Sequence, residues 1–292
     1  MRHSPHFSLP ERAPVARWVE RWGGASSTAL FDPRCELFRL PGVDGAIGFR
    51  RGLAGRAVAF GDPVCARYDR LMLVHGFRAR FRVTAFLGAS DEVRRLLAQL
   101  GYAAAEVGQS RVFDPQHDAL RGPGGYELKK RLLRARRAGV TVDSTRREGR
   151  RWFTAWVGGR RVGVLSLVRL RRAGGFLVEQ VLPAADAPGG TAETLVCAAL
   201  AGLAHEGATR LAFRPLPLAR PLCSFGFGPL SAALLRRAWP LGMRRFRRKT
   251  RARARRKQGH STLEPSYLLL APPRLGPLEL HAILRACDVW LS

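Results

Sequence analysis

Short apolar segments separated by glycine and proline mark the first third of the chain. Three of them, Glu36–Leu40, Gly45–Phe49 and Arg56–Phe60, have the length and spacing of antiparallel strands. They follow a polar lead-in over residues 1–30, in which Pro14–Trp22 has a short helical pattern. Gly61-Asp62-Pro63 then breaks the third strand, because glycine and proline both disfavour continued pairing.

A regular alternation of helices and strands is expected after this break. Glycine after an apolar helical pattern is typical of a helix end, and Ser90 before two acidic residues is typical of a helix start. The predicted elements are a helix over Ala66–His75 stopped by Gly76, a strand over Phe81–Leu87, a helix over Asp91–Leu100 and a strand over Arg111–Phe113.

The second half of the chain repeats this plan. Its sequence predicts strands, a loop rich in glycine and proline, a helix that ends at a glycine, and a further strand. We interpret the repeat as a structural duplication. The elements are a hairpin of Trp152–Val157 and Arg161–Val168 over Gly158-Gly159, a strand over Phe176–Leu182, a loop over Pro183–Gly190, a helix over Thr191–His205 and a strand over Arg210–Phe213.

This pattern predicts an α/β (α+β) protein with two domains, each a mixed, mostly antiparallel sheet flanked by helices. We place the lead-in at 1–30, the first domain at 31–120, a linking helix at 121–140 and the second domain at 141–292. A chain of 292 residues is long enough for two ordinary domains with real cores.

Net charge is the unusual feature of the composition. The chain has 50 Lys and Arg against 22 Asp and Glu, a formal net charge of +28. Hydrophobic residues make up 46%, which is normal for a folded protein and argues against disorder. A charge surplus of this size indicates a polyanionic partner, either tRNA, another nucleic acid or an anionic membrane surface.

The spacing of cysteine and histidine and the lengths of the apolar runs limit which other classes of protein the chain can belong to. The five cysteines are scattered with no Cys-x-x-Cys pair, so we expect no metal and a reducing, cytoplasmic compartment. The longest apolar run, Leu195 to Ala204, is too short for a transmembrane segment. A lipid substrate would therefore be reached peripherally, from the inner membrane face. The oligomeric state is left open.

Two segments concentrate the positive charge. The predicted helix Tyr126–Ala138 can dock through Leu128, Leu132 and Ala135, which leaves its cations for phosphate contacts. Its candidate binding residues are Lys129, Lys130, Arg131 and Arg134. The second segment is a polyanion-binding tract in which ten of fourteen residues are basic: Arg244, Arg245, Arg247, Arg248, Lys249, Arg251, Arg253, Arg255, Arg256 and Lys257. Phe246 interrupts it, either to stack on a base or to pack inward.

A third candidate binding site is the loop directly before the helix that begins at Thr191. Free N–H groups and the helix dipole make such a start an anion site, here with Gly189, Gly190 and Thr191 as candidate residues. The competing interpretation is an ordinary helix start with Thr191 as N-cap.

Glu179 is the candidate catalytic residue, because it lies within an apolar strand pattern. A carboxylate there needs a partner or a cleft, and it would suit a general base. A structural ion pair with one of the many arginines is the alternative. The histidines and cysteines give no spacing that supports a nucleophilic triad.

Five short motifs occur in a fixed order along the chain: Gly61-Asp62-Pro63, the basic helix Glu127–Gly139, Ala187-Pro188-Gly189-Gly190-Thr191, Pro215-Leu216-Pro217-Leu218-Ala219 and Glu264-Pro265-Ser266-Tyr267-Leu268. Together they resemble a known family, the cytosolic C-terminal module of phosphatidylglycerol lysyltransferases, here as a free-standing member. The resemblance runs over roughly residues 36 to 270.

This resemblance implies a tandem pair of acetyltransferase-like domains and an aminoacyltransferase. In such a reaction the aminoacyl group passes from the 3′ end of tRNA to a hydroxyl of a membrane lipid such as phosphatidylglycerol. One ester replaces another, so no coenzyme A, metal or ATP is expected. The resemblance places Glu179 where the family usually carries an aspartate, and Leu182 where it usually carries an arginine. Arg169, Arg171 or Arg214 are candidates to compensate for that lost charge.

Two other functions remain open from the sequence. One is an acyltransferase that uses acyl-coenzyme A, bound at the loop before Thr191. The other is a non-catalytic protein that binds RNA or an anionic membrane through the tract from Arg244 to Lys257.

Overall fold

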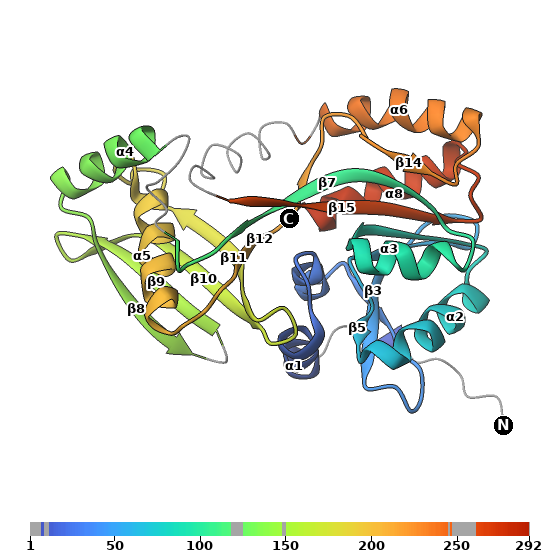
Figure 1. Ribbon diagram of the computed structural model, residues 1–292, viewed down its shortest axis with the longest axis horizontal. Coiled ribbons are helices and arrows are strands. Elements are labelled where there is room, and N and C mark those ends of the chain that lie inside the picture. Colours follow the sequence, from blue (N-terminus) through green and yellow to red (C-terminus); the bar gives the residue numbers. More distant parts are fainter. Residues whose placement is uncertain are drawn as a thin grey trace. The chain divides into compact units, whose positions relative to one another are not determined.

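The structure is a computed structural model that describes residues 7–8, 12–117, 125–147, 150–244, 246 and 261–291. The chain folds into two compact units (Figure 1). The first is built from the described parts of Met1–Ser110, Pro215–Thr250 and Pro265–Ser292. The second is built from those of Arg111–Arg214 and Arg251–Glu264.

The first unit contains a sheet with the strand order β1-β2-β3-β4-β6-β15-β7. Its strands are β1 (Phe7–Ser8), β2 (Glu36–Phe38), β3 (Gly45–Arg51), β4 (Arg56–Phe60), β5 (Val64–Cys65), β6 (Val83–Ala89), β7 (Ala103–Phe113), β13 (Leu216–Pro217), β14 (Ser224–Phe225) and β15 (Thr262–Ala271). β4 and β6 are parallel, whereas β2, β3 and β4 pair antiparallel in sequence. β5 pairs with β3, and β13 and β14 both pair with β7.

Helices cover both faces of this sheet. They are α1 (Arg12–Trp22), α2 (Arg70–Arg80), α3 (Asp91–Ala98), α6 (Pro229–Arg244) and α8 (Pro277–Trp290), with short 3-10 turns at Ser27–Phe31 and Arg67–Asp69. Alternate residues of β4 enter different cores: Val58 and Phe60 pack with α6 and α8, whereas Ala57 and Ala59 pack with α2 and α3. Burial on both faces explains why the central strands are apolar throughout.

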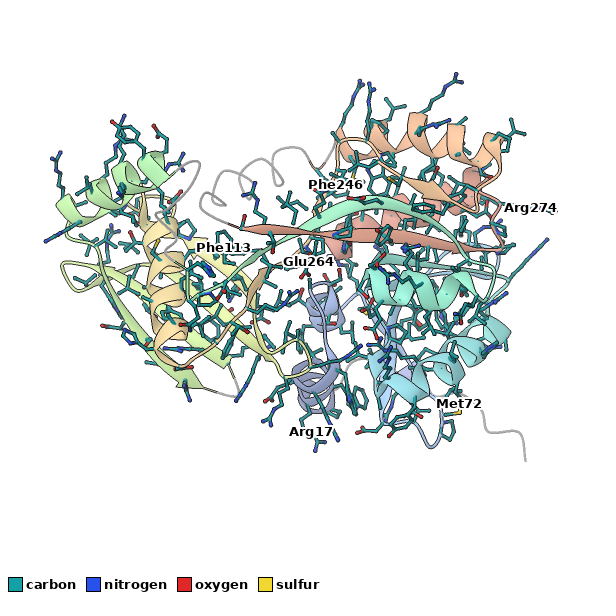
Figure 2. All side chains as sticks on the ribbon, in the orientation of Figure 1. Arg17, Met72, Phe113, Phe246, Glu264 and Arg274 are labelled. Atoms are coloured by element: carbon teal, nitrogen blue, oxygen red, sulfur yellow. The ribbon has the colours of Figure 1, made fainter. Side chains whose placement is uncertain are left out.

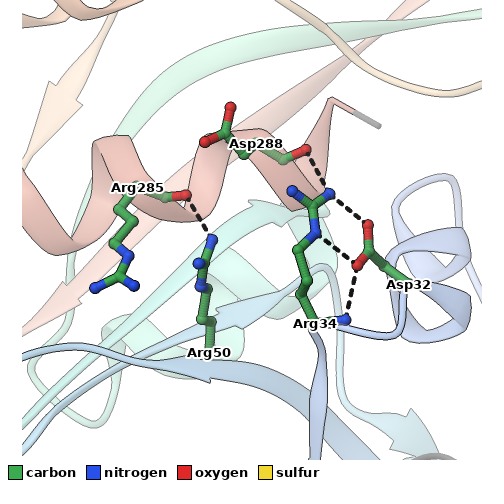
Figure 3. A network of polar contacts seen from close by, with 5 residues as sticks. All are labelled: Asp32, Arg34, Arg50, Arg285 and Asp288. Carbon is green, nitrogen blue, oxygen red and sulfur yellow. Dashed lines mark hydrogen bonds and ion pairs between the residues drawn. The ribbon is translucent and has the colours of Figure 1, made fainter.

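Helix α8 is fixed to the N-terminal part of the unit by two arginines (Figure 3). Arg34 donates to the carbonyl oxygen of Asp288 at 3.3 Å, and Arg50 donates to that of Arg285 at 3.1 Å. Arg34 is itself held by the Asp32 carboxylate, a hydrogen bond that raises the pKa of the guanidinium. Cations at the end of a helix satisfy its last carbonyl groups and its dipole.

The second unit is a sheet with the order β12-β11-β10-β9-β8, and the last residues of β7 pair with β12. Its elements are β8 (Thr141–Arg147), β9 (Arg150–Val157), β10 (Arg160–Leu170), β11 (Gly175–Pro183), β12 (Leu211–Phe213), α4 (Gly125–Arg137) and α5 (Thr191–His205). β11 and β12 are parallel, and the other pairs are antiparallel. Leu195, Ala199 and Leu203 of α5 form the core with the inward side chains of the sheet.

Both units thus contain one parallel strand pair joined by a helix, β4–α2–β6 in the first and β11–α5–β12 in the second. The other strand pairs with a determined direction are antiparallel. The predicted fold class, an α/β (α+β) protein with mixed, mostly antiparallel sheets flanked by helices, is confirmed.

The division of the chain differs from the predicted boundaries at 120 and 141. The C-terminal segment lies in the first unit, because β15 is inserted between β6 and β7 of that unit's sheet. Gly76 also differs from its predicted role, since it lies inside α2 rather than at its end. A Cβ at Gly76 would meet the side chain of Leu40, so this glycine allows close packing instead of stopping the helix.

Candidate functional site

Glu179 lies at a β-bulge in strand β11. Ser166 of β10 faces Gln180 and the next residue, Leu167, faces Val178, so Glu179 is the extra residue between these pairs. Bulges re-aim side chains and are common beside active sites. The pairing of β11 with β12 also stops here, because its last pair is Val178 with Phe213. The two parallel strands therefore part at Glu179.

The Glu179 carboxylate is held by two neighbouring strands. Arg150 of β9 donates from Nε to Oε2 at 2.9 Å and from Nη2 to Oε1 at 3.1 Å. The hydroxyl of Ser166, on β10, donates to Oε2 at 3.1 Å. A bidentate, charge-assisted pair of this kind fixes the plane of the carboxylate. The Glu179 side chain remains 18% exposed, so the oriented acid can still be reached from outside.

The position suits substrate chemistry. In open α/β sheets, ligands bind beyond the carboxyl ends of parallel strands, where the strands separate. Val178 and Phe213 form the last pair between β11 and β12. Glu179 is the next residue after Val178, and Arg214 is the next residue after Phe213. One strand thus contributes a carboxylate at this level and the other contributes a guanidinium group.

The start of α5 differs from the predicted capped helix. Gly190, with a φ of 101°, is the N-cap, and Thr191 is the first helical residue. Thr191 is buried, and both its N–H and its hydroxyl donate to the carbonyl oxygen of Pro188, at 3.2 and 2.7 Å. A positive φ favours glycine, which is why Gly190 rather than Thr191 occupies the cap. Gly189 is exposed with open space beside it.

Helix α4 packs against this helix start. A Cβ on Gly190 would overlap the carbonyl oxygen of Arg131, so only glycine permits the contact. Arg131 also donates to the buried Glu193 carboxylate, in the first turn of α5, at 2.7 Å. The structure therefore brings together the predicted residues Gly190, Thr191 and Arg131, with Arg131 engaged in an ion pair.

The other cations of α4 face outward. Of the three residues predicted to dock this helix, Leu128 and Ala135 are buried and Leu132 is half-buried. Tyr126 and Leu133, seven residues apart and thus on one face, are also exposed, at 77% and 52%. The outward surface of α4 therefore combines positive charge with an exposed aromatic ring. Its exposed cations are Lys129, Lys130, Arg134, Arg136 and Arg137.

The structure describes only the beginning of the predicted polyanion-binding tract. Arg244 is exposed at the end of α6, in the first unit. Phe246 is buried in the core with Trp239 and Met243 (Figure 2), so the inward alternative applies and base stacking does not. The remaining members lie outside the described residues: Arg245, Arg247, Arg248, Lys249, Arg251, Arg253, Arg255, Arg256 and Lys257.

An arginine partner of Glu179 was one of the two expected alternatives, and the structure has this ion pair, but the sequence identified neither Arg150 nor Ser166. The arginines named from the sequence, Arg169, Arg171 and Arg214, were substitutes for the charge lost at Leu182, which is 53% exposed. Arg150 precedes Glu179 by 29 residues and lies two strands away, so only the pairing register brings them together. A serine in the apolar strand β10 was the available signal for Ser166, because buried hydroxyls require a partner.

The corresponding place in the first unit is occupied by internal contacts. Asp62, after β4, accepts a hydrogen bond from the backbone N–H of Ser90 at 2.8 Å, and burial raises the pKa of its carboxyl. Arg70 is fully buried beside Glu92, with an N–O distance of 3.3 Å. The acid of Gly61-Asp62-Pro63 thus ties its loop to the start of α3.

The described part of the chain offers neither a metal-binding group nor a membrane-spanning helix. No three His, Cys, Asp or Glu side chains there gather in a group that could hold a metal ion. Within the same residues, no helix is long and apolar enough to cross a bilayer.

Comparison with known proteins finds a sequence family and solved structures that this chain resembles. Residues 25–151 match the sequence model of the family described as phosphatidylglycerol lysyltransferase, C-terminal. None of the curated proteins matches the chain.

Solved structures match over nearly the whole chain. The C-terminal domain of a putative lysylphosphatidylglycerol synthetase from Agrobacterium fabrum is 18% identical, with a TM-score of 0.74 over 94% of this chain and 95% of that one. The L-PGS structure from Bacillus licheniformis is 16% identical, with a TM-score of 0.72 over 97% of both chains. The predicted resemblance to the C-terminal module of phosphatidylglycerol lysyltransferases is thereby confirmed, in sequence over residues 25–151 and in fold over nearly the whole chain.

Proposed function

We propose that this protein transfers an aminoacyl group from aminoacyl-tRNA to a hydroxyl group of a membrane lipid such as phosphatidylglycerol. The observation that carries the proposal is Glu179, an oriented and partly exposed carboxylate at the point where β11 and β12 part. The match of residues 25–151 to the lysyltransferase family supports this reaction class over other acyl transfers.

In the proposed reaction, Glu179 is the general base. It accepts the proton of the lipid hydroxyl as that oxygen attacks the ester carbonyl of the aminoacyl-tRNA. A carboxylate offers about four acceptor positions, and Arg150 and Ser166 use three of them, which leaves one for the substrate. When the tetrahedral intermediate collapses, the 3′ oxygen of the tRNA leaves and takes this proton from Glu179.

Arg214 is proposed to stabilise the negative charge that develops on the carbonyl oxygen. It lies at the same level as Glu179 on the parted strands, and a preorganised cation there acts where the charge forms. Arg150 has a different role in this scheme, because it contacts the base and fixes its orientation. The reaction exchanges one ester for another, so it requires no coenzyme A, metal or ATP.

Helix α4 is the proposed tRNA surface. Its exposed cations can neutralise phosphates, and Tyr126 offers a ring on which an unpaired base can stack. The ion pair of Arg131 with Glu193 and the contact at Gly190 hold this surface against the start of α5. The protein would thus act in the cytoplasm and meet its lipid at the inner membrane face.

The coenzyme A alternative has less support. In that interpretation the pyrophosphate binds at the N-terminus of α5. The Arg131 carbonyl oxygen closes one side of that helix start at Gly190, and the first turn contains the Glu193 carboxylate. The carbonyl oxygen carries a partial negative charge that opposes an anion at this helix start, and the Arg131 guanidinium is already paired with Glu193.

The proposal is tested by mixing the protein with tRNAs charged with labelled amino acids and vesicles that contain phosphatidylglycerol or other hydroxyl-bearing lipids. Label that enters the organic phase and disappears after RNase treatment would establish the transferase. Single amino acids then identify the donor. Retention of tRNA without any transfer would indicate a binding protein, and coenzyme A-dependent labelling would support the other acyltransferase.

A further inference from the structure

Helix α6 has two different apolar faces. Its inner face packs Ala232, Leu235, Trp239 and Met243 into the core of the first unit. Trp239 is fully buried there, and its indole N–H donates to the carbonyl oxygen of Leu218 at 2.9 Å. The packing of the inner face therefore fixes the orientation of α6 and determines which side chains form the opposite face.

The outer face alternates leucine and arginine. Leu230, Arg237, Leu241 and Arg244 follow one another at spacings of 7, 4 and 3 residues, which places them along one line of the helix. Leu230 is 86% exposed and Leu241 is 58% exposed. No described core cluster includes either leucine. An apolar line of this kind is not required by the fold of the unit.

The segment that contains α6 carries no acidic residue. No Asp or Glu occurs in the sequence between Glu206 and Glu264. Four arginines of the described part of this stretch are exposed in the first unit: Arg220, Arg236, Arg237 and Arg244. A helix face that combines leucine with arginine, within a segment that has no acids, complements an apolar layer covered by negative charge.

We propose that the outer face of α6 docks the protein on a membrane surface that contains anionic lipid. Leu230 and Leu241 enter the boundary between headgroups and acyl chains, and the arginines of the helix extend toward the lipid phosphates. Nucleic acid would use the arginines and leave Leu230 and Leu241 in water, so it fits the face less well.

This docking surface is separate from the candidate site, which lies in the second unit. Membrane binding can therefore be measured whether or not the protein transfers an aminoacyl group, and the failure of one proposal leaves the other standing.

The test is co-sedimentation of the full chain with vesicles of phosphatidylcholine, with or without about 30% phosphatidylglycerol. The double variant Leu230→Ser and Leu241→Ser removes the apolar line, and Leu53→Ser is the matched control. Leu53 is 58% exposed, like Leu241, but lies between β3 and β4. Because all three leucines are exposed, thermal melting should be unchanged.

We expect wild type to bind the anionic vesicles and the double variant to bind them about tenfold or more weakly, from the lost apolar contacts. Leu53→Ser should bind within about twofold of wild type. Arg236→Gln with Arg237→Gln should weaken binding at low salt and much less at high salt.

Three results would overturn the proposal. The first is a double variant that still binds like wild type, and the second is an equal loss with Leu53→Ser. The third is a loss of tRNA binding in the double variant while vesicle binding stays intact, which would assign the face to nucleic acid. A matched tryptophan pair, Leu230→Trp and Leu53→Trp, adds a direct reading. Lipids with brominated acyl chains should quench the added emission of Leu230→Trp only.

Discussion

Arg150 binds both carboxylate oxygens of Glu179 from two strands away, at 2.9 and 3.1 Å. The pair joins β9 to β11 across β10, and Ser166 of the strand between them completes the set. A carboxylate in an apolar strand requires polar partners. Arg150 and Ser166 are these partners for Glu179. The β-bulge and the partial exposure of Glu179 indicate that this residue has a role beyond stabilising the sheet.

Arg150→Lys should lower the turnover number while leaving the Michaelis constant for the lipid nearly unchanged. Lysine keeps the positive charge but cannot form the bidentate pair that orients Glu179. Arg150→Ala should be less active still and should cost about 1–3 kcal/mol in the free energy of unfolding, measured with urea. A loss of stability with full activity in the folded fraction would show that Arg150 has a structural role alone.

The matched control is the exposed pair of Arg160 with Asp186, in the same unit. Its side chains are about 60% exposed, and such pairs contribute less than about 1 kcal/mol. Arg160→Ala should therefore change neither transfer nor stability to a comparable extent.

Gly190→Ala should destabilise the second unit, whereas Gly189→Ala should be tolerated. The new methyl group at 190 would meet the Arg131 carbonyl oxygen and would require a φ of 101° from alanine. A cost of about 1–3 kcal/mol is expected from strain of this kind. Position 189 has open space, so its change should stay within about 0.5 kcal/mol. Equal unfolding midpoints for the two variants would contradict the packing of α4 on α5.

Replacing Lys129, Lys130 and Arg134 with glutamine should weaken tRNA binding and reduce its dependence on salt. Each phosphate contact that is lost lowers the slope of log affinity against log salt concentration by about 0.7–0.9. Filter binding over a salt series measures both quantities. The α6 variant Arg236→Gln with Arg237→Gln is the matched control, because it should impair vesicle binding and leave tRNA binding largely intact.

Glu279 should give the first unit part of its acid sensitivity. Burial alone would raise the pKa of this carboxyl, but hydrogen bonds from backbone N–H groups and from Arg56 outweigh it and hold the pKa below its usual value. A lowered folded-state pKa contributes stability above the ordinary carboxyl range, and this is lost as the pH falls through the lowered value. Glu279→Gln should therefore flatten the fall of the melting temperature between about pH 5 and pH 3. An unchanged slope would refute this role.

Local rules predicted most of the elements because they depend on neighbours in the sequence. The helix at Thr191–His205 and the strand at Arg56–Phe60 have the predicted bounds, and Ser90 caps α3 by accepting from the Val93 N–H at 3.3 Å. The inclusion of β15 in the first unit could not be read from local patterns, because it depends on pairing with β6, about 180 residues earlier in the chain.

The candidate site was predictable only in part, for the same reason. Glu179 was found because an acid in an apolar strand conflicts with its surroundings. Its partners Arg150 and Ser166 depend on the strand register, and the contact of Gly190 with Arg131 depends on how two helices pack. Apart from the serine in an apolar strand at position 166, these contacts leave no signal in a chain with 50 basic residues, where many arginines are available as partners.

The central claim is that Glu179 is the base of an aminoacyl transfer to lipid. It is tested most directly by single-turnover transfer of label from aminoacyl-tRNA to lipid, with wild type and Glu179→Gln compared at equal tRNA binding. Glu206→Gln, which alters an acid paired with Arg146 and Arg151 in the same unit, is the control. We expect RNase-sensitive transfer by wild type and the control, and a rate about 100-fold or more lower for Glu179→Gln. Transfer by Glu179→Gln at the wild-type rate would contradict the account.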